Sequence, residues 1–329
     1  RDPTNLEWLA GLGAVHFWLG SIEYSQGNLD EAESRFITYL EVAQRLEKLE
    51  PGNPDWRMET AYGFTNLAAV AEERGDLGTA LEFIQSSIAI KRELSAQNPD
   101  DASLKSGLAN SLGWAGRMLE TSGDRAGALA VLQESETVIG DLMAKDPGNS
   151  NHQELMSVTL HLIAVIQRDL GQAEAAIRSF RADLAIISKL VERDPENATW
   201  RGGLAVTKRT LGQQLLWLGM VEEAEPLIRD AEVLVRDLRQ HLDRARFCER
   251  PKGVHGHARR VDAKPEARNE ALGGARPPSR HPFGSPAQHA SDVVALHGRD
   301  GALEELLIGL RRPDRIVARR ILHHRHELL

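Results

Sequence analysis

The chain has 329 residues, of which 41% are hydrophobic and 5% aromatic, and Cys248 is its single cysteine. One cysteine excludes an intramolecular disulfide framework and a cysteine-based zinc site within one chain. No apolar run approaches the roughly 18 residues that a membrane-spanning helix needs. We therefore expect a cytoplasmic protein without a membrane segment, whose core is built mainly from Leu, Ile, Val and Ala.

The formal net charge of -8 conceals two unlike parts. Residues 1–243 carry 23 Lys and Arg against 38 Asp and Glu, a net charge of -15. Residues 244–329 carry 17 against 10, a net charge of +7. This asymmetry predicts an acidic domain over 1–243 and a basic tail over 244–329.

The acidic part repeats with a period of 48 residues. The repeat is marked by a glycine, by an alanine five residues later and by a proline between units: Gly27, Gly75, Gly123, Gly171 and Gly219; Ala32, Ala80, Ala128, Ala176 and Ala224; Pro3, Pro51, Pro99, Pro147 and Pro195. A fixed period of this length indicates an array of one supersecondary unit, in which neighbours bury each other's apolar faces. The repeated alanine is expected where paired helices approach most closely.

Each unit is predicted to hold two helices. The first begins after an N-cap residue at Asp55, Ser103, Asn151 or Thr199 and ends at the repeated glycine, which can adopt a left-handed conformation. Asn151 with Glu154 fits a capping box. The predicted ranges are near 8–26, 56–74, 104–122, 152–170 and 200–218. Leu19, Leu67, Ala115, Ile163 and Leu211 occupy one expected core position.

The second helix of each unit starts directly after the glycine, with Asn28, Asp76 and Asp124 as N-caps in three units. The predicted ranges are near 29–49, 77–97, 125–145, 173–193 and 221–241. Its expected apolar stripe joins the repeated alanine to three further positions: Phe36, Ile84, Leu132, Phe180 and Ile228; Val42, Ile90, Val138, Ile186 and Leu234; Leu46, Leu94, Leu142, Leu190 and Leu238.

These units resemble tetratricopeptide repeats, because helix pairs with a small residue, a glycine, an alanine five residues later and a terminal proline are typical of that family. Leu19-Gly20, Gly116 and Leu211-Gly212 match part of its first-helix pattern, and Glu222-Glu223-Ala224-Glu225-Pro226-Leu227 resembles its second helix. The resemblance implies an all-α, right-handed superhelical solenoid of about five antiparallel helix pairs. The long period and the Asp194-Pro195-x-Asn197 joint are similar to arrays in bacterial signalling proteins, some attached to serine/threonine kinases.

The 48-residue repeat ends near residue 243, because the position of the next joint proline holds Asp243. The following residues, 244–329, contain 7 of the 14 prolines and 8 of the 12 histidines. This composition predicts either a disordered basic tail or the product of a GC-rich gene read out of frame. At the other end, Arg1-Asp2-Pro3 matches a joint, so we expect the N-terminus to be truncated.

The sequence contains no pattern that predicts catalysis or a cofactor. Gly11-Leu12-Gly13 lacks the third glycine of a nucleotide-binding loop, and phosphate-binding, nucleophile-elbow and zinc-protease motifs are absent. His323-His324-Arg325-His326 lies in the tail without a nearby carboxylate or cysteine, so we expect no metal site there. Basic residues of the tail are dispersed, which makes nucleic-acid binding the weaker interpretation.

Proteins of this family bind partners along a concave face lined by the first helices. The resemblance places the following residues in such a groove: Phe17, Tyr24, Tyr62, Asn66, Trp114, Arg117, His161, Arg168, Arg209 and Trp217. Trp114 and Trp217 have an alternative role, since they could pack between adjacent units. Only Asn66 and Arg209 fall on the family's clamp for a terminal carboxylate, so binding of that group is not expected.

The sequence therefore predicts a non-enzymatic scaffold with a protein or peptide partner. Two alternatives remain open at this point. The chain could be the C-terminal regulatory portion of a larger bacterial signalling enzyme such as a serine/threonine kinase, or a nucleic-acid-associated regulator that uses its basic tail.

Overall fold

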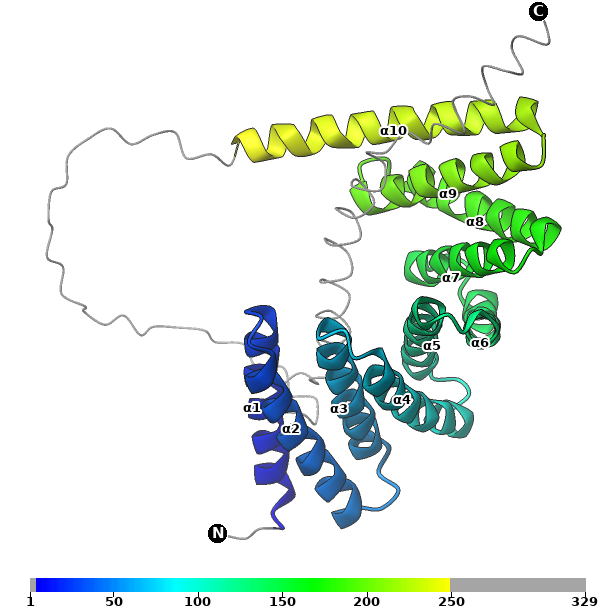
Figure 1. Cartoon of the computed structure of the whole chain (residues 1–329). Helices are drawn as coiled ribbons and strands as arrows, with labels where there is room; N and C mark the ends of the chain where they lie inside the picture. Colours follow the sequence, from blue (N-terminus) through cyan, green and yellow to red (C-terminus); the bar gives the residue numbers. More distant parts are fainter. Residues whose placement is uncertain (1–3, 249–329) are drawn as a thin grey trace, which may run out of the picture.

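A computed structural model describes residues 4–248 of the chain. This part consists of ten α-helices arranged as five pairs (Figure 1): α1 (Leu6–Ser25) and α2 (Leu29–Leu49), α3 (Pro54–Glu73) and α4 (Leu77–Gln97), α5 (Ala102–Ser122) and α6 (Arg125–Lys145), α7 (Ser150–Asp169) and α8 (Ala173–Arg193), and α9 (Ala198–Trp217) and α10 (Val221–Cys248). Below, the odd-numbered helices are called first helices and the even-numbered ones second helices.

The pairs stack along one axis. Each second helix packs against the first helix of its own pair and against the first helix of the next pair. Figure 1 shows the pairs following an arc, with α3, α5, α7 and α9 toward its inner side and α4, α6 and α8 toward its outer side. The predicted all-α solenoid of antiparallel helix pairs is confirmed for the described residues.

The repeated glycines lie at equivalent corners, between the two helices of each pair. All five have a positive φ, from 76° at Gly171 to 91° at Gly123. At the second corner the Gly75 N–H donates to Glu72 O at 2.8 Å and the Asp76 N–H to Ala71 O at 2.9 Å, which closes the C-terminus of α3. The predicted role of these glycines is confirmed, because a side chain would strain this left-handed backbone.

The repeated alanines are all completely buried: Ala32, Ala80, Ala128, Ala176 and Ala224. A Cβ added to Gly212 of α9 would lie 3.3 Å from the carbonyl oxygen of Ala224 and 2.6 Å from a side-chain carbon of Ile228 on α10. The two helices of the pair therefore approach each other closely where their small residues face, as expected.

The first helices begin two residues earlier than predicted. Their N-caps are Asn5, Asn53, Asp101, Asn149 and Asn197, not Asp55, Ser103, Asn151 and Thr199. The predicted capping box at Asn151 is likewise replaced by Asn149, whose side chain accepts from the backbone N–H of Asn151 and His152. Both the predicted and the observed N-cap residues repeat every 48 positions. The observed set, which comes two residues earlier, accepts hydrogen bonds from the free N–H groups of the first helical turn and leaves a shorter joint between units.

The second helices begin and end as predicted, except for the last. Asp76 and Asp124 cap α4 and α6 by accepting from Thr79 N and Gly127 N at 3.1 and 2.9 Å. Asn28 occupies the same position before α2, but its side chain donates to Glu23 and Gln26 instead of capping the helix.

The apolar stripe of the second helices differs from the prediction at one position. The Leu46 set is buried throughout. In the Val42 set only Val42 is buried, and Ile90, Val138, Ile186 and Leu234 are half-buried. The fully buried position is one residue later, at Ala43, Lys91, Ile139, Ile187 and Val235. With 3.6 residues per turn, a residue seven places after Phe36 lies within about 20° of it, whereas six places deviates by about 120°. In α1, Leu19 is exposed although its four counterparts are buried.

Helix α10 continues to Cys248, beyond the predicted end near 241, so the boundary expected at 243/244 falls within a helix. The rest of the predicted tail, including His323, His324 and His326, lies outside the described residues. Among the described helices, none combines the length and the apolar character required to traverse a bilayer.

Candidate partner-binding groove

Each of the first helices α3, α5, α7 and α9 has two faces occupied by second helices and one face left over. In α5, Gly116 faces Leu132 of α6 in the same pair. Ser111 accepts a hydrogen bond from Lys91 of α4 in the preceding pair. At about 100° per residue, Arg117 lies roughly 100° from Gly116 and 120° from Ser111. Arg117 is exposed and therefore marks the remaining face, which we call the inner face.

The structure divides the ten predicted groove residues into three groups. Arg117 and Trp217 are exposed; Tyr24, Tyr62, His161, Arg168 and Arg209 are half-buried; Phe17, Asn66 and Trp114 are buried. Only the first two groups offer side-chain surface to a partner, so the buried residues do not belong to the candidate contact surface.

Two of the buried residues have clear structural roles. The Trp114 Nε1–H donates to Glu72 Oε2 at 2.7 Å and so connects α5 to α3. This is the alternative role that the sequence left open for this residue. Phe17 packs against Tyr39 of α2, with ring centroids 5.6 Å apart. The side chains of Trp114 and Phe17 therefore hold neighbouring helices together and are not free to contact a partner.

Sequence reasoning missed Val158 of α7, which is 52% exposed. Val158 is two periods after Tyr62 and thus occupies the same position of its unit. Comparing equivalent positions across all five units would have identified it. The inner face is therefore represented by Tyr62, Arg117, Val158 and Trp217, which come from four successive first helices.

A buried basic cluster lies beneath Tyr62. Lys91 of α4 is 3% exposed, and its Nζ donates to Ser111 Oγ of α5 at 2.7 Å and to Thr65 Oγ1 of α3 at 3.3 Å. The same Nζ lies 5.4 Å from the centroid of the Tyr62 ring, a cation–π contact. Burial lowers the pKa of Lys91 to about 8. Lys91 thereby connects two neighbouring first helices through one ammonium group.

A buried acidic cluster plays the same geometric role two pairs later. Asp183 of α8 is 1% exposed and accepts hydrogen bonds from Ser157 of α7 and from Thr207 of α9, the latter at 2.7 Å. His161 Nδ1 of α7 lies 3.1 Å from Asp183 Oδ2, the oxygen that also accepts from Thr207, and the His161 ring meets Phe180 edge-on. Asp183 therefore fixes the orientation of His161 at the border of the inner face.

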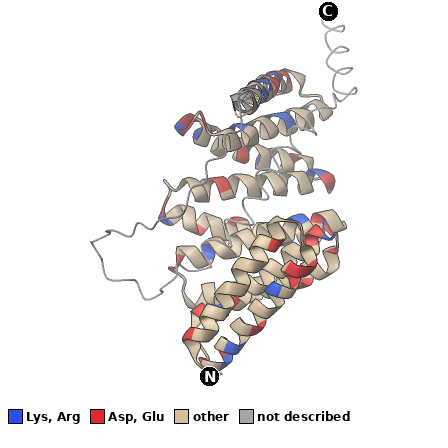
Figure 2. Cartoon of the chain, turned by 90° about the vertical axis from the view of Figure 1, so that its left-hand side faces the viewer, with Lys and Arg blue, Asp and Glu red and all other residues tan. Residues whose placement is uncertain are grey.

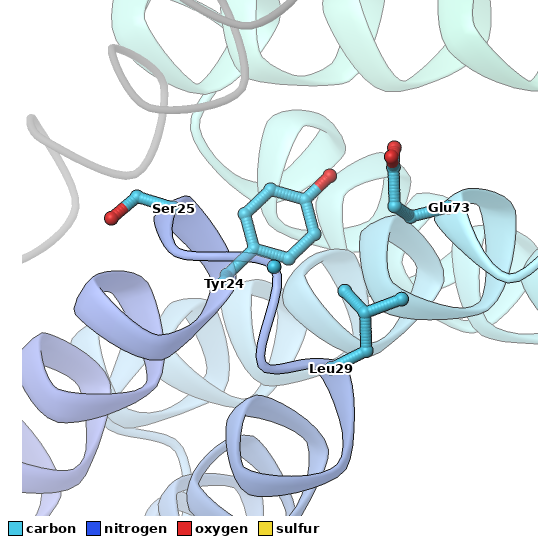
Figure 3. A pocket seen from close by; sticks show the side chains of 5 residues that line it. Tyr24, Ser25, Leu29 and Glu73 are labelled. Atoms are coloured by element: carbon cyan, nitrogen blue, oxygen red, sulfur yellow. The ribbon is translucent and has the colours of Figure 1, made fainter.

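A small pocket of about 260 Å³ lies where the α1–α2 turn meets the end of α3. The ring of Tyr24 stands between this turn and Glu73, with Ser25, Gly27 and Leu29 completing the wall (Figure 3). Burial, together with the negative charges of Glu73 and Glu72, raises the pKa of Tyr24 to about 12. Tyr24 is thus a neutral phenol at physiological pH, at the edge of the arc.

Charges on the described helices are interspersed. In the ribbon of Figure 2, positions of Asp and Glu and positions of Lys and Arg are scattered among one another over the described helices. Among the side chains of residues 4–240, no group of three or more His, Cys, Asp or Glu is placed to hold a metal ion.

Comparison with known proteins finds similarity at the level of structure. No protein-family model and no curated protein matches the sequence. BtubC (BKLC) from P. vanneervenii has a TM-score of 0.53 and 18% identity, covering 78% of this chain and 89% of that one. A Podosopora anserina putative kinesin light chain with nearly identical TPR-like repeats has a TM-score of 0.51 and 15% identity, covering 69% of this chain and 96% of that one.

A third solved structure, aspartyl phosphate phosphatase F from Bacillus subtilis, has a TM-score of 0.50 and 13% identity, covering 71% of this chain and 54% of that chain. At such low identities these likenesses concern the fold alone. Together with the five stacked helix pairs and their equivalent glycine corners, they show that residues 4–248 form a helical repeat of the tetratricopeptide type.

Proposed function

We propose that the chain is a non-enzymatic protein-interaction scaffold whose inner face binds a segment of a partner protein. The observation that carries this proposal is the series Tyr62, Arg117, Val158 and Trp217, in which four neighbouring first helices each present a side chain on the inner face. Aromatic and arginine side chains are the types that most often anchor protein interfaces.

The composition of the inner face indicates the kind of segment it would bind. Tyr62, Val158 and Trp217 provide apolar surface, while Arg117 provides a fixed positive charge at their centre. A segment with apolar anchors on either side of an acidic residue would complement this order. The partner is therefore proposed to be a peptide segment of mixed apolar and acidic character.

The two buried clusters support binding by keeping the inner face in one conformation. Lys91 connects α3 to α5, and Asp183 connects α7 to α9, so the spacing of the first helices is held from below. A surface that is already ordered loses little conformational freedom when a partner binds.

Selection from a random-peptide display library on the full chain tests this proposal, followed by affinity measurement of the selected peptides. Arg117→Glu should weaken their binding at least tenfold. Arg178→Glu provides the control, because Arg178 is also an exposed arginine but belongs to the second helix α8. Peptides whose affinity is unchanged by Arg117→Glu, or reduced equally by Arg178→Glu, would contradict the proposal.

We also propose, as a second candidate, that this scaffold is the regulatory portion of a larger bacterial signalling enzyme acting in the cytoplasm. This proposal is supported by the resemblance of the 48-residue unit and its Asp-Pro-x-Asn joints to arrays in bacterial signalling proteins. Kinase motifs in the genomic reading frame upstream of Arg1 would support it, and a stop codon directly upstream would remove it. Of the predicted basic tail, residues 249–329 lie outside the described residues, so the structure adds no support for nucleic-acid binding.

A further inference from the structure

A pocket of about 350 Å³ lies at the joint between the third and the fourth helix pair. The start of α5, the end of α6 and the start of α7 form its wall, which includes Ser106, Leu142, Asp146 and His152. We call it the joint pocket. It shares no residue with the inner face and is therefore independent of the proposed function.

The repeat shows what fills the same space at two other joints. His152 of α7 occupies the position of Trp56 in α3 and of Trp200 in α9. Both indole rings pack against apolar residues in the C-terminal half of the preceding second helix, α2 or α8. An imidazole ring is smaller than an indole ring, and Leu142 of the preceding helix α6 lines the joint pocket beside it. The joint pocket is therefore explained by the replacement of a tryptophan by His152.

Each of the two indole rings also donates a hydrogen bond to a carboxylate. Trp56 Nε1–H donates to Glu50 Oε2 at 2.7 Å. Trp200 Nε1–H donates to Glu154 Oε2 at 3.0 Å. In the joint pocket, Asp146 occupies the position of Glu50, so a carboxylate that can accept from an N–H group is present there as well.

The imidazole of His152 provides a second polar group in the wall. His152 is 9% exposed, and its Nδ1 is buried without a hydrogen-bond partner among the residues that the structure describes. Buried polar side-chain atoms are paired in the large majority of cases. An unpaired buried nitrogen on a residue that lines a pocket therefore indicates that the pocket receives a group able to pair with it.

The charges around the joint pocket favour a neutral ligand with a hydrogen-bond donor. Lys145 lines the pocket, but its Nζ lies 2.6 Å from Asp100 Oδ1. The Asp146 carboxylate accepts from Asn149 Nδ2 at 3.1 Å and has further acceptor positions. Among the described residues of the wall, an acceptor is thus available and the one lysine is already paired, which does not suit an anion.

We propose that the joint pocket binds a small, neutral, planar aromatic molecule that carries an N–H donor, of the indole type. The ring of this molecule takes the place of the missing tryptophan side chain against Leu142. Its N–H group donates to the Asp146 carboxylate, as Trp56 does to Glu50. The Nδ1 atom of His152 pairs with a polar substituent on the ring.

Ligand-observed NMR titration of the full chain tests this proposal with two probes, indole and benzofuran. Benzofuran has the shape of indole but an oxygen atom in place of the N–H group. Indole should bind with a dissociation constant of about 1 mM or lower. Benzofuran should bind about tenfold more weakly, because it cannot donate a hydrogen bond to Asp146. A chain that does not bind indole, or that binds both probes equally, would overturn the proposal.

Two substitutions locate the binding site of indole. His152→Trp places the chain's own indole ring in the joint pocket and should weaken the binding of free indole by about tenfold or more. Asn151→Trp is the matched control, because it introduces the same ring one residue away, at an exposed position that does not line the pocket. This control should bind indole as the wild type does. Undiminished binding in His152→Trp would mean that indole occupies another site and would contradict the proposal.

A second readout and a second variant guard against a change in folding. Indole should raise the Tm of the wild-type chain and leave that of His152→Trp unchanged, because a ligand stabilises only a folded chain that binds it. Ser106→Phe obstructs the pocket from the α5 side and replaces His152→Trp if circular dichroism shows that the latter does not fold. It should weaken indole binding by a similar factor. An equal rise in Tm with indole in the wild-type chain and in the folded variant would overturn the proposal.

Discussion

The two buried polar clusters have the same task and opposite charge. Lys91 and Asp183 each join a first helix to the next one, but their surroundings differ. Asp183 is surrounded by Ser157, His161 and Thr207, so both carboxylate oxygens have partners. The ammonium group of Lys91 contacts two hydroxyl groups and an aromatic ring. Lys105, Lys145 and Lys208, in contrast, each pair with a carboxylate. Hydrogen bonds offset much of the cost of burying the Asp183 carboxylate. The contacts of Lys91 offset less of the cost of burying its ammonium group.

The largest expected effect follows from removing the acidic centre. Asp183→Ala should lower the free energy of unfolding by about 2–4 kcal/mol, because the buried Ser157 hydroxyl loses its acceptor and the Thr207 hydroxyl keeps only the Gly203 carbonyl oxygen. Urea denaturation followed by circular dichroism measures this change. Asp230→Ala is a suitable control, since Asp230 is 57% exposed and pairs only with Lys208 at the surface. Similar losses for both variants would show that Asp183 is not the centre of a cluster.

Removing the basic centre should have the opposite sign. Lys91→Met keeps the length of the side chain and abolishes a buried charge that lacks a carboxylate partner. We expect the free energy of unfolding at pH 7 to rise by about 1–2 kcal/mol, after allowance for the lost hydrogen bonds to Ser111 and Thr65. A clear destabilisation in the same urea experiment would mean that the ammonium group is better compensated than its contacts indicate.

The pH dependence of stability provides a second measurement on Lys91. The unfolded chain holds this proton up to a pH near 10.5, and the folded chain only up to about 8. Between these values the unfolded state binds more protons, so the stability contribution of this group rises with pH. The advantage of Lys91→Met over wild type should therefore shrink between about pH 8 and pH 10. Tyr24 and Tyr62, whose pKa values are raised to about 12, are present in both chains and cancel in this difference.

The sequence predicted the fold well because its markers are backbone requirements that repeat. Each glycine corner needs a left-handed residue and each buried alanine needs a small one, so both positions survive in all five units. The predicted starts of the first helices were two residues late. Asn53 and Asp55 each belong to a series of polar residues that repeats every 48 positions, so periodicity alone does not distinguish the two. Only the geometry of the joint decides between them.

The clusters and the buried groove residues could not be predicted in this way. A lone lysine or aspartate in a helical pattern indicates a solvent-exposed face, since such residues are rarely buried. The partners of Asp183 are 22 to 26 residues away on two other helices, and they become neighbours only through stacking. Trp114 is similar, because its acceptor Glu72 is 42 residues away.

A smaller effect is expected at the edge of the acidic cluster. His161→Phe retains an aromatic ring against Phe180 but removes the hydrogen bond to Asp183, and should lower stability by about 1 kcal/mol. The His161 side chain is 20% exposed, so water can replace part of what is lost. In the Asp183→Ala background the same change should cost nothing. A double-mutant cycle measures this coupling, and additive losses would contradict a direct interaction.

The smallest effect is expected at an exposed ion pair whose contact is as short as those of the buried clusters. Arg181 of α8 lies 2.6 Å from Glu223 of α10, but the two side chains are 50 and 44% exposed. Arg181→Ala should lower stability by at most about 0.5–1 kcal/mol, because water solvates both charges in the folded and the unfolded chain. The loss should shrink further in molar salt, which screens exposed pairs and affects buried ones far less. A loss as large as that of Asp183→Ala would mean that contact distance, and not burial, determines how strongly polar groups join neighbouring helix pairs.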